Sequence, residues 1–161
     1  MKDENPAPLL ERVFGNIAAT RMADMPLANP SLAVEAVAFR RQGANGHWLG
    51  VLITPWAMNL LYLPTTDGTP PWPDKKAGDK HLWRFPSGAY EFTVAAEEAL
   101  GVYHLCSLFS PPTQFATQEA ARQTACATLA ALMSGDDDKA APADAPATSA
   151  GSRRAFLRLG R

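Results

Sequence analysis

The sequence contains few of the residues that enzyme and metal chemistry most often use. Among its 161 residues there are two cysteines and three histidines. It has neither a Gly-x-Ser-x-Gly nucleophile motif nor a glycine-rich phosphate loop. These absences argue against nucleophilic catalysis and against phosphate binding by a backbone cradle. The adjacent acids Glu97 and Glu98 do not form a catalytic pair either, because neighbouring helical positions diverge by about 100°.

The sequence also lacks a charge excess and a long apolar run. Its 15 basic and 16 acidic residues give a net charge of −1, which provides no field for nucleic acid or an anionic membrane. No apolar run approaches the roughly 18 residues of a membrane helix, and Lys2, Asp3 and Glu4 do not open a signal peptide. Two cysteines fit free thiols in a reducing compartment. We therefore expect a cytoplasmic protein with no nucleic-acid partner and no membrane insertion.

What is present predicts one domain of class α+β over residues 1–133. A hydrophobic content of 47% in a chain of this length is enough for one core. Apolar residues at helical spacing predict helices over 8–22 and 114–133, with one further helical turn at 95–100. Alternating or β-branched runs predict strands over 32–39, 47–53, 60–63, 82–86, 90–94 and 102–109. The expected architecture is an antiparallel β-sheet packed with an N-terminal and a C-terminal α-helix, followed by a disordered tail.

The stretch from Leu49 to Leu60 is the most informative part of this domain. A run of valine, leucine and isoleucine indicates a buried strand, and Pro55 ends it by removing a backbone donor. Trp56 and Met58 then follow at a place where a turn is normally polar. Large apolar side chains beyond a strand end more often contact a partner than solvent. Trp56 and Met58 are therefore expected to be exposed for contact, whereas Trp48 and Trp83 are expected in the core.

The composition changes after the second helix. Residues 134–151 contain an aspartate run, alanines and prolines, which predict a disordered linker. Residues 152–161 follow and include Arg153, Arg154, Phe156 and Leu157 in the pattern Ser-Arg-Arg-x-Phe-Leu-basic of twin-arginine export signals. The chain ends three residues after this pattern, so the pattern has no apolar segment to direct export. It is either a basic tail with a chance resemblance or an imitation of a real signal on another protein.

Four blocks of residues carry a resemblance to a known family. They are Asn29-Pro30 with 34–37, the segment 48–60, Gly88 with Tyr90-Glu91-Phe92, and the segment 106–111. In combination they resemble the HybE-type assembly chaperones of [NiFe]-hydrogenases, over roughly residues 8–133. Some members of that group carry a rubredoxin domain with two Cys-x-x-Cys pairs. This chain has no such pair, so the resemblance implies no iron centre and no cofactor here.

The resemblance implies a maturation factor that is not an enzyme. Such a protein is expected to bind the large-subunit or small-subunit precursor of a [NiFe]-hydrogenase, or other hydrogenase maturation proteins, before assembly and export. The small-subunit precursor carries a twin-arginine signal, and the C-terminal pattern would compete with it for a shared site. The residues expected to contact a partner are Pro55, Trp56, Met58, Asn59, Glu35, Glu91 and Phe109.

Two readings remain open for several of these residues. Glu35 and Glu91 could pair with the arginines of a signal, or could simply lie on the solvent side of their strands. His104 and Cys106 are two apart in a strand, so their side chains share a face and could carry a metal in a redox or metal-carrying maturation factor. The competing reading is that Cys106 behaves as a small buried hydrophobe. Cys126 is expected in the core of the second helix.

Overall fold

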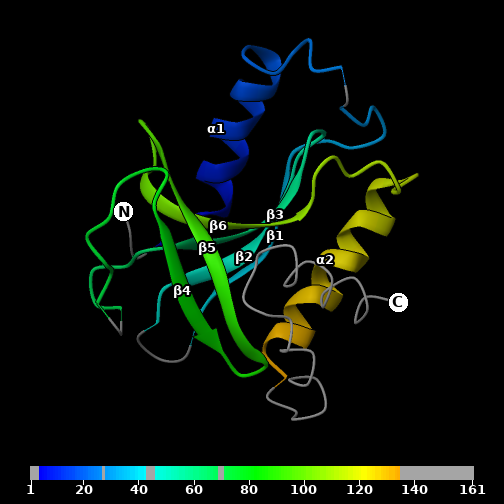
Figure 1. Ribbon diagram of the computed structural model, residues 1–161. Coiled ribbons are helices and arrows are strands. Elements are labelled where there is room, and N and C mark those ends of the chain that lie inside the picture. The colour runs from blue at the N-terminus through cyan, green and yellow to red at the C-terminus, as the bar shows by residue number, and fades with distance from the viewer. Residues whose placement is uncertain (1–3, 27, 43–45, 69–70, 135–161) are drawn as a thin grey trace.

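The computed structural model describes residues 4–26, 28–42, 46–68 and 71–134, and it confirms the α+β class. The predicted linker from residue 135 and the Arg-Arg motif lie outside the described residues. Within the described ranges the chain forms two helices and six strands (Figure 1), which are α1 (Ala7–Ala19), β1 (Glu35–Arg41), β2 (Trp48–Ile53), β3 (Met58–Leu63), β4 (Lys80–Phe85), β5 (Gly88–Glu97), β6 (Gly101–Phe109) and α2 (Gln118–Leu132).

The six strands form one antiparallel sheet in the order β1-β2-β3-β6-β5-β4. It contains four hairpins, β1-β2, β2-β3, β4-β5 and β5-β6. The long segment between β3 and β4 allows β6 to pair with β3 in the centre. β1 and β4 are therefore the two edge strands among the described residues. No helix within the described ranges is long and apolar enough to cross a membrane.

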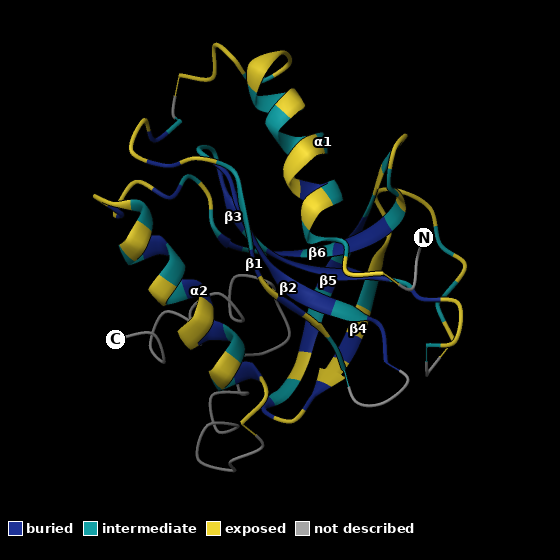
Figure 2. Ribbon diagram, turned by 180° about the vertical axis from the view of Figure 1, so that it is seen from behind, coloured by how far each residue is buried: buried dark blue, intermediate teal, exposed yellow. Residues whose placement is uncertain are grey.

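The two helices lie on opposite faces of the sheet and cover two apolar clusters (Figure 2). Alternation along each strand sends successive side chains to opposite faces, so one strand supplies both clusters. Leu10 of α1 packs with Leu52, Leu61 and Tyr103 on one face. On the other face α2 lies over β1 and β2, and Ala125 is fully buried there. β4 and β5 extend beyond the cover of α2, which leaves that part of the sheet to be closed by aromatic side chains.

Two predicted elements differ most from the structure. The helical turn predicted at 95–100 is wrong, because β5 continues to Glu97 and a tight turn leads into β6. Gly101 has a φ of +79°, a conformation that favours glycine and here reverses the chain rather than capping a helix. The second helix begins later than expected, at Gln118. Thr117 caps it, since its side-chain oxygen accepts a hydrogen bond from the Ala120 N–H at 3.0 Å.

Candidate functional site

The predicted contact segment forms the tight turn between β2 and β3. Thr54 closes this turn, because its N–H and its hydroxyl both donate to the Ala57 carbonyl, at 2.9 and 2.8 Å. The Ala57 N–H donates back to the Thr54 hydroxyl oxygen at 3.0 Å. Pro55 and Trp56 occupy the two central positions of the turn and are half-buried. The turn therefore presents a tryptophan side chain on a backbone that is fixed from both sides.

A buried asparagine ties this turn to two other connections. The Asn29 N–H donates to the Pro55 carbonyl at 2.7 Å, and Asn29 Nδ2 donates to the carbonyls of Pro112 and Phe115 at 2.9 and 2.8 Å. The Asn29 Oδ1 accepts from the Ser31 N–H at 2.8 Å. Asn29 is only 8% exposed, so water cannot readily replace these bonds. Two of the sequence blocks that carry the family resemblance, those at Asn29 and at Pro55, thus meet at one residue, which also holds the connection that follows β6.

The sheet register brings most of the predicted contact residues to this same end. Glu35 lies opposite Ile53, which lies opposite Met58, and Met58 lies opposite Phe109. These four positions form one row across β1, β2, β3 and β6. We call this region, together with Asn29 and the turn at 54–57, the hairpin end. Asn59 is the next residue along β3 and is half-buried.

The structure corrects the prediction for Met58. It is fully buried in the core beneath α2, not exposed for contact. The reason is that β3 begins at Met58, so alternation along the strand sets its side chain inward together with Leu60. Trp56 keeps partial exposure because it lies in the turn, outside the alternation. Trp83 is 5% exposed, which confirms its predicted place in the core, and Trp48 is half-buried at the edge of the other cluster.

Glu35 already has partners within the chain. Its carboxylate accepts from Arg122 Nε at 2.8 Å and Nη2 at 3.1 Å, and from Gln118 Nε2 at 2.9 Å. The hydrogen bond from Arg122 is the main reason that the pKa of Glu35 lies below its ordinary value, against the effect of burial, and the Gln118 hydrogen bond and the charge of Arg122 add smaller contributions. Glu35 therefore fixes α2 to the edge strand β1. Glu91 lies away from the hairpin end, on β5 opposite Leu82.

His104 and Cys106 share one face of β6, as their spacing predicts, and both are buried. His104 Nδ1 accepts a hydrogen bond from Trp83 Nε1 at 2.8 Å. The proton of the neutral imidazole therefore sits on Nε2, which is buried and has no hydrogen-bond partner in the described structure. Among the described residues no group of three histidine, cysteine or acidic side chains is placed to hold a metal. Cys126 is exposed on α2, so its predicted burial is wrong.

His104 is part of an aromatic group that the sequence did not predict. The group joins side chains from three strands and two loops, namely His47, Tyr62, Trp72, Trp83, Phe85 and His104. The ring of Trp72 lies 4.3 Å from that of His104, centroid to centroid. Burial, with smaller effects of positive charge at His81, Lys75 and His47, lowers the pKa of His104 to about 4. His104 is therefore neutral at pH 7. The one local sequence feature that could have indicated this aromatic group is Trp72, which lies between two prolines at 71–73.

Comparison with a solved structure shows the same fold. The solution structure of HybE from Escherichia coli aligns with a TM-score of 0.64 and 28% identity, over 81% of this chain and 78% of that one. The sequence also matches the family described as "[NiFe]-hydrogenase assembly, chaperone, HybE" over residues 5–159. The fold and the sequence thus define an assembly chaperone as the class. The chain belongs to the HybE family of [NiFe]-hydrogenase assembly chaperones.

Relatives within the family extend the match over almost the whole chain. Protein HoxT from Cupriavidus necator is 41% identical over 155 residues, which is 92% of this chain and 85% of HoxT. The hydrogenase expression/formation protein HupJ from Bradyrhizobium diazoefficiens is also 41% identical, over 93% of this chain and 85% of HupJ. The resemblance inferred from the sequence blocks is therefore confirmed.

Proposed function

We propose that this chain is a non-catalytic chaperone that binds precursors of [NiFe]-hydrogenase subunits through the hairpin end, before assembly and export. The observation that carries the proposal is the convergence of Pro55, Trp56 and Phe109 in one region that Asn29 holds together from within. Binding before export would take place in the cytoplasm.

The chemistry of this region suits protein recognition. Tryptophan is enriched at the centres of protein interfaces, where its large ring is buried at little entropic cost. Trp56 is held by a turn that is closed by the Thr54 and Ala57 hydrogen bonds and fixed from outside by the Asn29 N–H, so its backbone is already ordered before a partner arrives. A rigid turn of this kind would lose little conformational freedom on binding, which favours a stable complex with an exposed apolar segment of a precursor.

We further propose that the partner is the small-subunit precursor with its twin-arginine signal. Because Glu35 is already bound by Arg122, it is not the residue that would receive an incoming arginine. Glu91 is half-buried on the other half of the sheet and is the remaining acidic candidate. The Arg153-Arg154 motif of this chain would then compete with the signal for one site.

The test is a co-purification of the tagged full chain with large-subunit and small-subunit precursors and with the mature subunits. Capture of a precursor but not of its mature form is expected. Trp56→Ala should weaken that capture at least ten-fold. Leu9→Ala is the matched control, because Leu9 is a partly exposed apolar residue on α1 that lies beside Trp48 and Leu63, at the opposite end of β2 and β3 from the hairpin end. Unchanged capture by Trp56→Ala would contradict the proposed surface.

The competition is tested separately with the isolated signal peptide. Replacing Arg153 and Arg154 by alanine in the full chain should raise the affinity for the peptide several-fold. An unchanged affinity would show that the tail does not share a site with the signal. It would not contradict the proposed capture of precursors.

A further inference from the structure

β4 offers an open strand edge. It pairs with β5 on one side, and within the described residues no strand lies on its other side. Phe85 and Gly88 flank a two-residue turn, so Phe85, Trp83 and His81 form the hydrogen-bonded pairs with β5. The N–H and C=O groups of Leu82 and Arg84 therefore point away from β5. The Lys80 carbonyl also points outward, where Lys75 Nζ donates to it at 2.7 Å.

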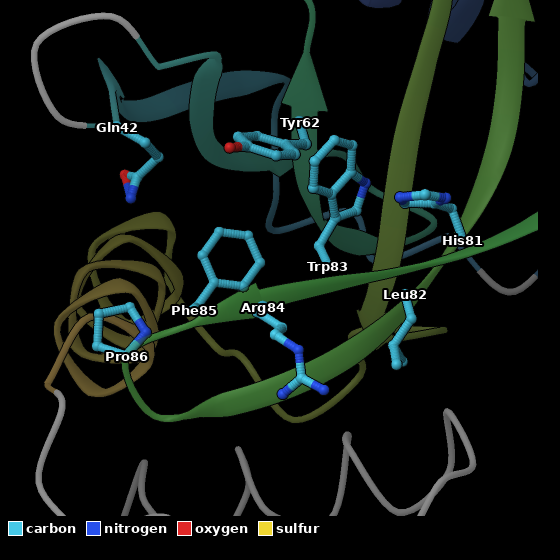
Figure 3. Close-up of a pocket in the computed structure, with 8 residues that line it drawn as sticks. All are labelled: Gln42, Tyr62, His81, Leu82, Trp83, Arg84, Phe85 and Pro86. Carbon is cyan, nitrogen blue, oxygen red and sulfur yellow. The ribbon is translucent and has the colours of Figure 1, made fainter. Parts of the chain in front are cut away.

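An aromatic pocket lies directly beside this edge. Its volume is about 410 Å³, and Tyr62, Trp83 and Phe85 form its wall together with Gln42 and Pro86 (Figure 3). Figure 3 shows Trp83 and Phe85 on one side of β4, and Leu82 and Arg84 on the other. Burial raises the pKa of Tyr62 to about 12, so this wall is uncharged at neutral pH. An open edge with an adjoining apolar pocket is the arrangement that binds an extended peptide as an added strand.

The described part of the chain ends at the rim of this pocket. The Ser87 N–H donates to the Leu132 carbonyl at 3.1 Å, which fixes the end of α2 against the turn after β4. Gln42 Nε2, whose residue lines the pocket, lies 3.1 Å from Met133 Sδ. The last described residue, Ser134, therefore lies close to Phe85 and Pro86. The segment that follows starts next to the site.

We propose that the C-terminal segment of this chain adds to the edge of β4 as a strand and places Phe156 in the aromatic pocket. Beyond residue 134 the only large apolar residues are Phe156, Leu157 and Leu159. About 18 residues of chain separate Ser134 from Arg153. A random coil of that length would span roughly 23 Å, and a strand of six residues is about 20 Å long. The connection is thus long enough to lay these residues along β4, and covalent linkage gives an effective concentration on the order of millimolar.

Alternation along the added strand makes the proposal specific. With Phe156 in the pocket, Leu157 falls on the opposite face, beside Leu82, which is 54% exposed. Arg154 falls on the pocket side, toward the C-terminal end of α2. The last turn of α2 contains no basic residue, so the helix itself places no cation beside the negative end of its dipole. The inference deepens the proposed function by naming the surface that tail and signal would share.

The experiment measures amide hydrogen exchange by NMR in the free full chain, with no precursor present. The Leu82 and Arg84 amides are expected to exchange at least ten-fold more slowly than unpaired strand amides do. Phe156→Asp should abolish this protection. Ala147→Asp, which adds the same charge in the linker, should leave it unchanged. The Trp83 amide bonds to β5 and should stay protected in all three proteins, which checks that the domain is folded.

Three outcomes would overturn the inference. Fast exchange at Leu82 and Arg84 in the unaltered chain would show that nothing covers the edge. Protection that survives Phe156→Asp would assign the edge to another segment. Protection that grows with protein concentration would assign it to a second copy of the chain. None of these results bears on the capture of precursors by Trp56, so the two proposals can fail separately.

Discussion

The two ends of the sheet are held together by different forces. At the hairpin end, Asn29 joins three connections through hydrogen bonds to the backbone. At the other end, the aromatic group closes the sheet through ring contacts, and the buried N–H groups of Trp72 and His104 have no hydrogen-bond partner in the described structure. Hydrogen bonds fix direction, whereas apolar contacts depend mainly on buried area. Loss of a single polar side chain should therefore destabilise the fold at the hairpin end, whereas introduction of a charge should destabilise it at the aromatic end.

The strongest test of the hairpin end is Asn29→Ala. It removes the side-chain bonds to Pro112, Phe115 and Ser31, and takes away this partner from the carbonyls of the buried residues Pro112 and Phe115. We expect a loss of about 4 kcal/mol in the free energy of unfolding, because each unsatisfied buried group costs about 1–3 kcal/mol. Urea unfolding measures it. Asn16→Ala, at an exposed position of α1, is the control and should change stability by less than about 0.5 kcal/mol. Equal losses of stability in the two variants would contradict the role of the Asn29 side chain at the hairpin end.

The aromatic end is tested by pH. The pKa of His104 is about 4 in the folded chain and near 6.5 when unfolded. The folded state thus disfavours protonation of His104. The contribution of neutral His104 to the free energy of unfolding is fully present above pH 6.5 and is lost as the pH falls toward 4. We expect a loss of about 3 kcal/mol over this window, at about 1.4 kcal/mol per pH unit. Unfolding curves at pH 7, 5.5 and 4 measure it.

His104→Gln is the matched variant for this test. Glutamine can still accept the hydrogen bond from Trp83 but does not titrate. Its stability should therefore fall by about 3 kcal/mol less than that of the unaltered chain between pH 7 and 4. If the two proteins lose stability in parallel, the pH dependence belongs to other groups.

The smallest effect is expected at the ion pair between Glu35 and Arg122. Glu35→Gln should cost under 1 kcal/mol at pH 7, because the Arg122 side chain is 40% exposed and water screens the pair. Since the pair lowers the pKa of Glu35, this stabilisation is present at neutral pH and is lost as the pH falls below the ordinary carboxyl range. Thermal unfolding at pH 7 and pH 3 measures it. Glu119→Gln removes the other acid that contacts Arg122, at a side chain that is 61% exposed, and should have a smaller effect. A larger effect would show that Arg122 pairs mainly with Glu119.

The sequence predicted the hairpin end better than the aromatic end. Pro55 and the asparagine at position 29 stand beside strand signals, and local signals of this kind mark turns correctly. The error at Met58 came from treating it as part of the turn, when one residue of register decides whether a side chain faces the core. Trp72 lies in a proline-rich segment that predicts an irregular loop. Nothing local indicates that this loop returns to cover His104.

The sequence by itself determined the class of the fold, the family and the place of the turn at 54–57, because each depends on residues close together in the chain. Only the tertiary structure decided that Asn29 holds that turn, that Glu35 is bound by Arg122, and that β4 has an open edge beside an aromatic pocket. These features depend on the order of strands in the sheet. That order places β4 at the edge and β6 beside β3, and no local pattern specifies it.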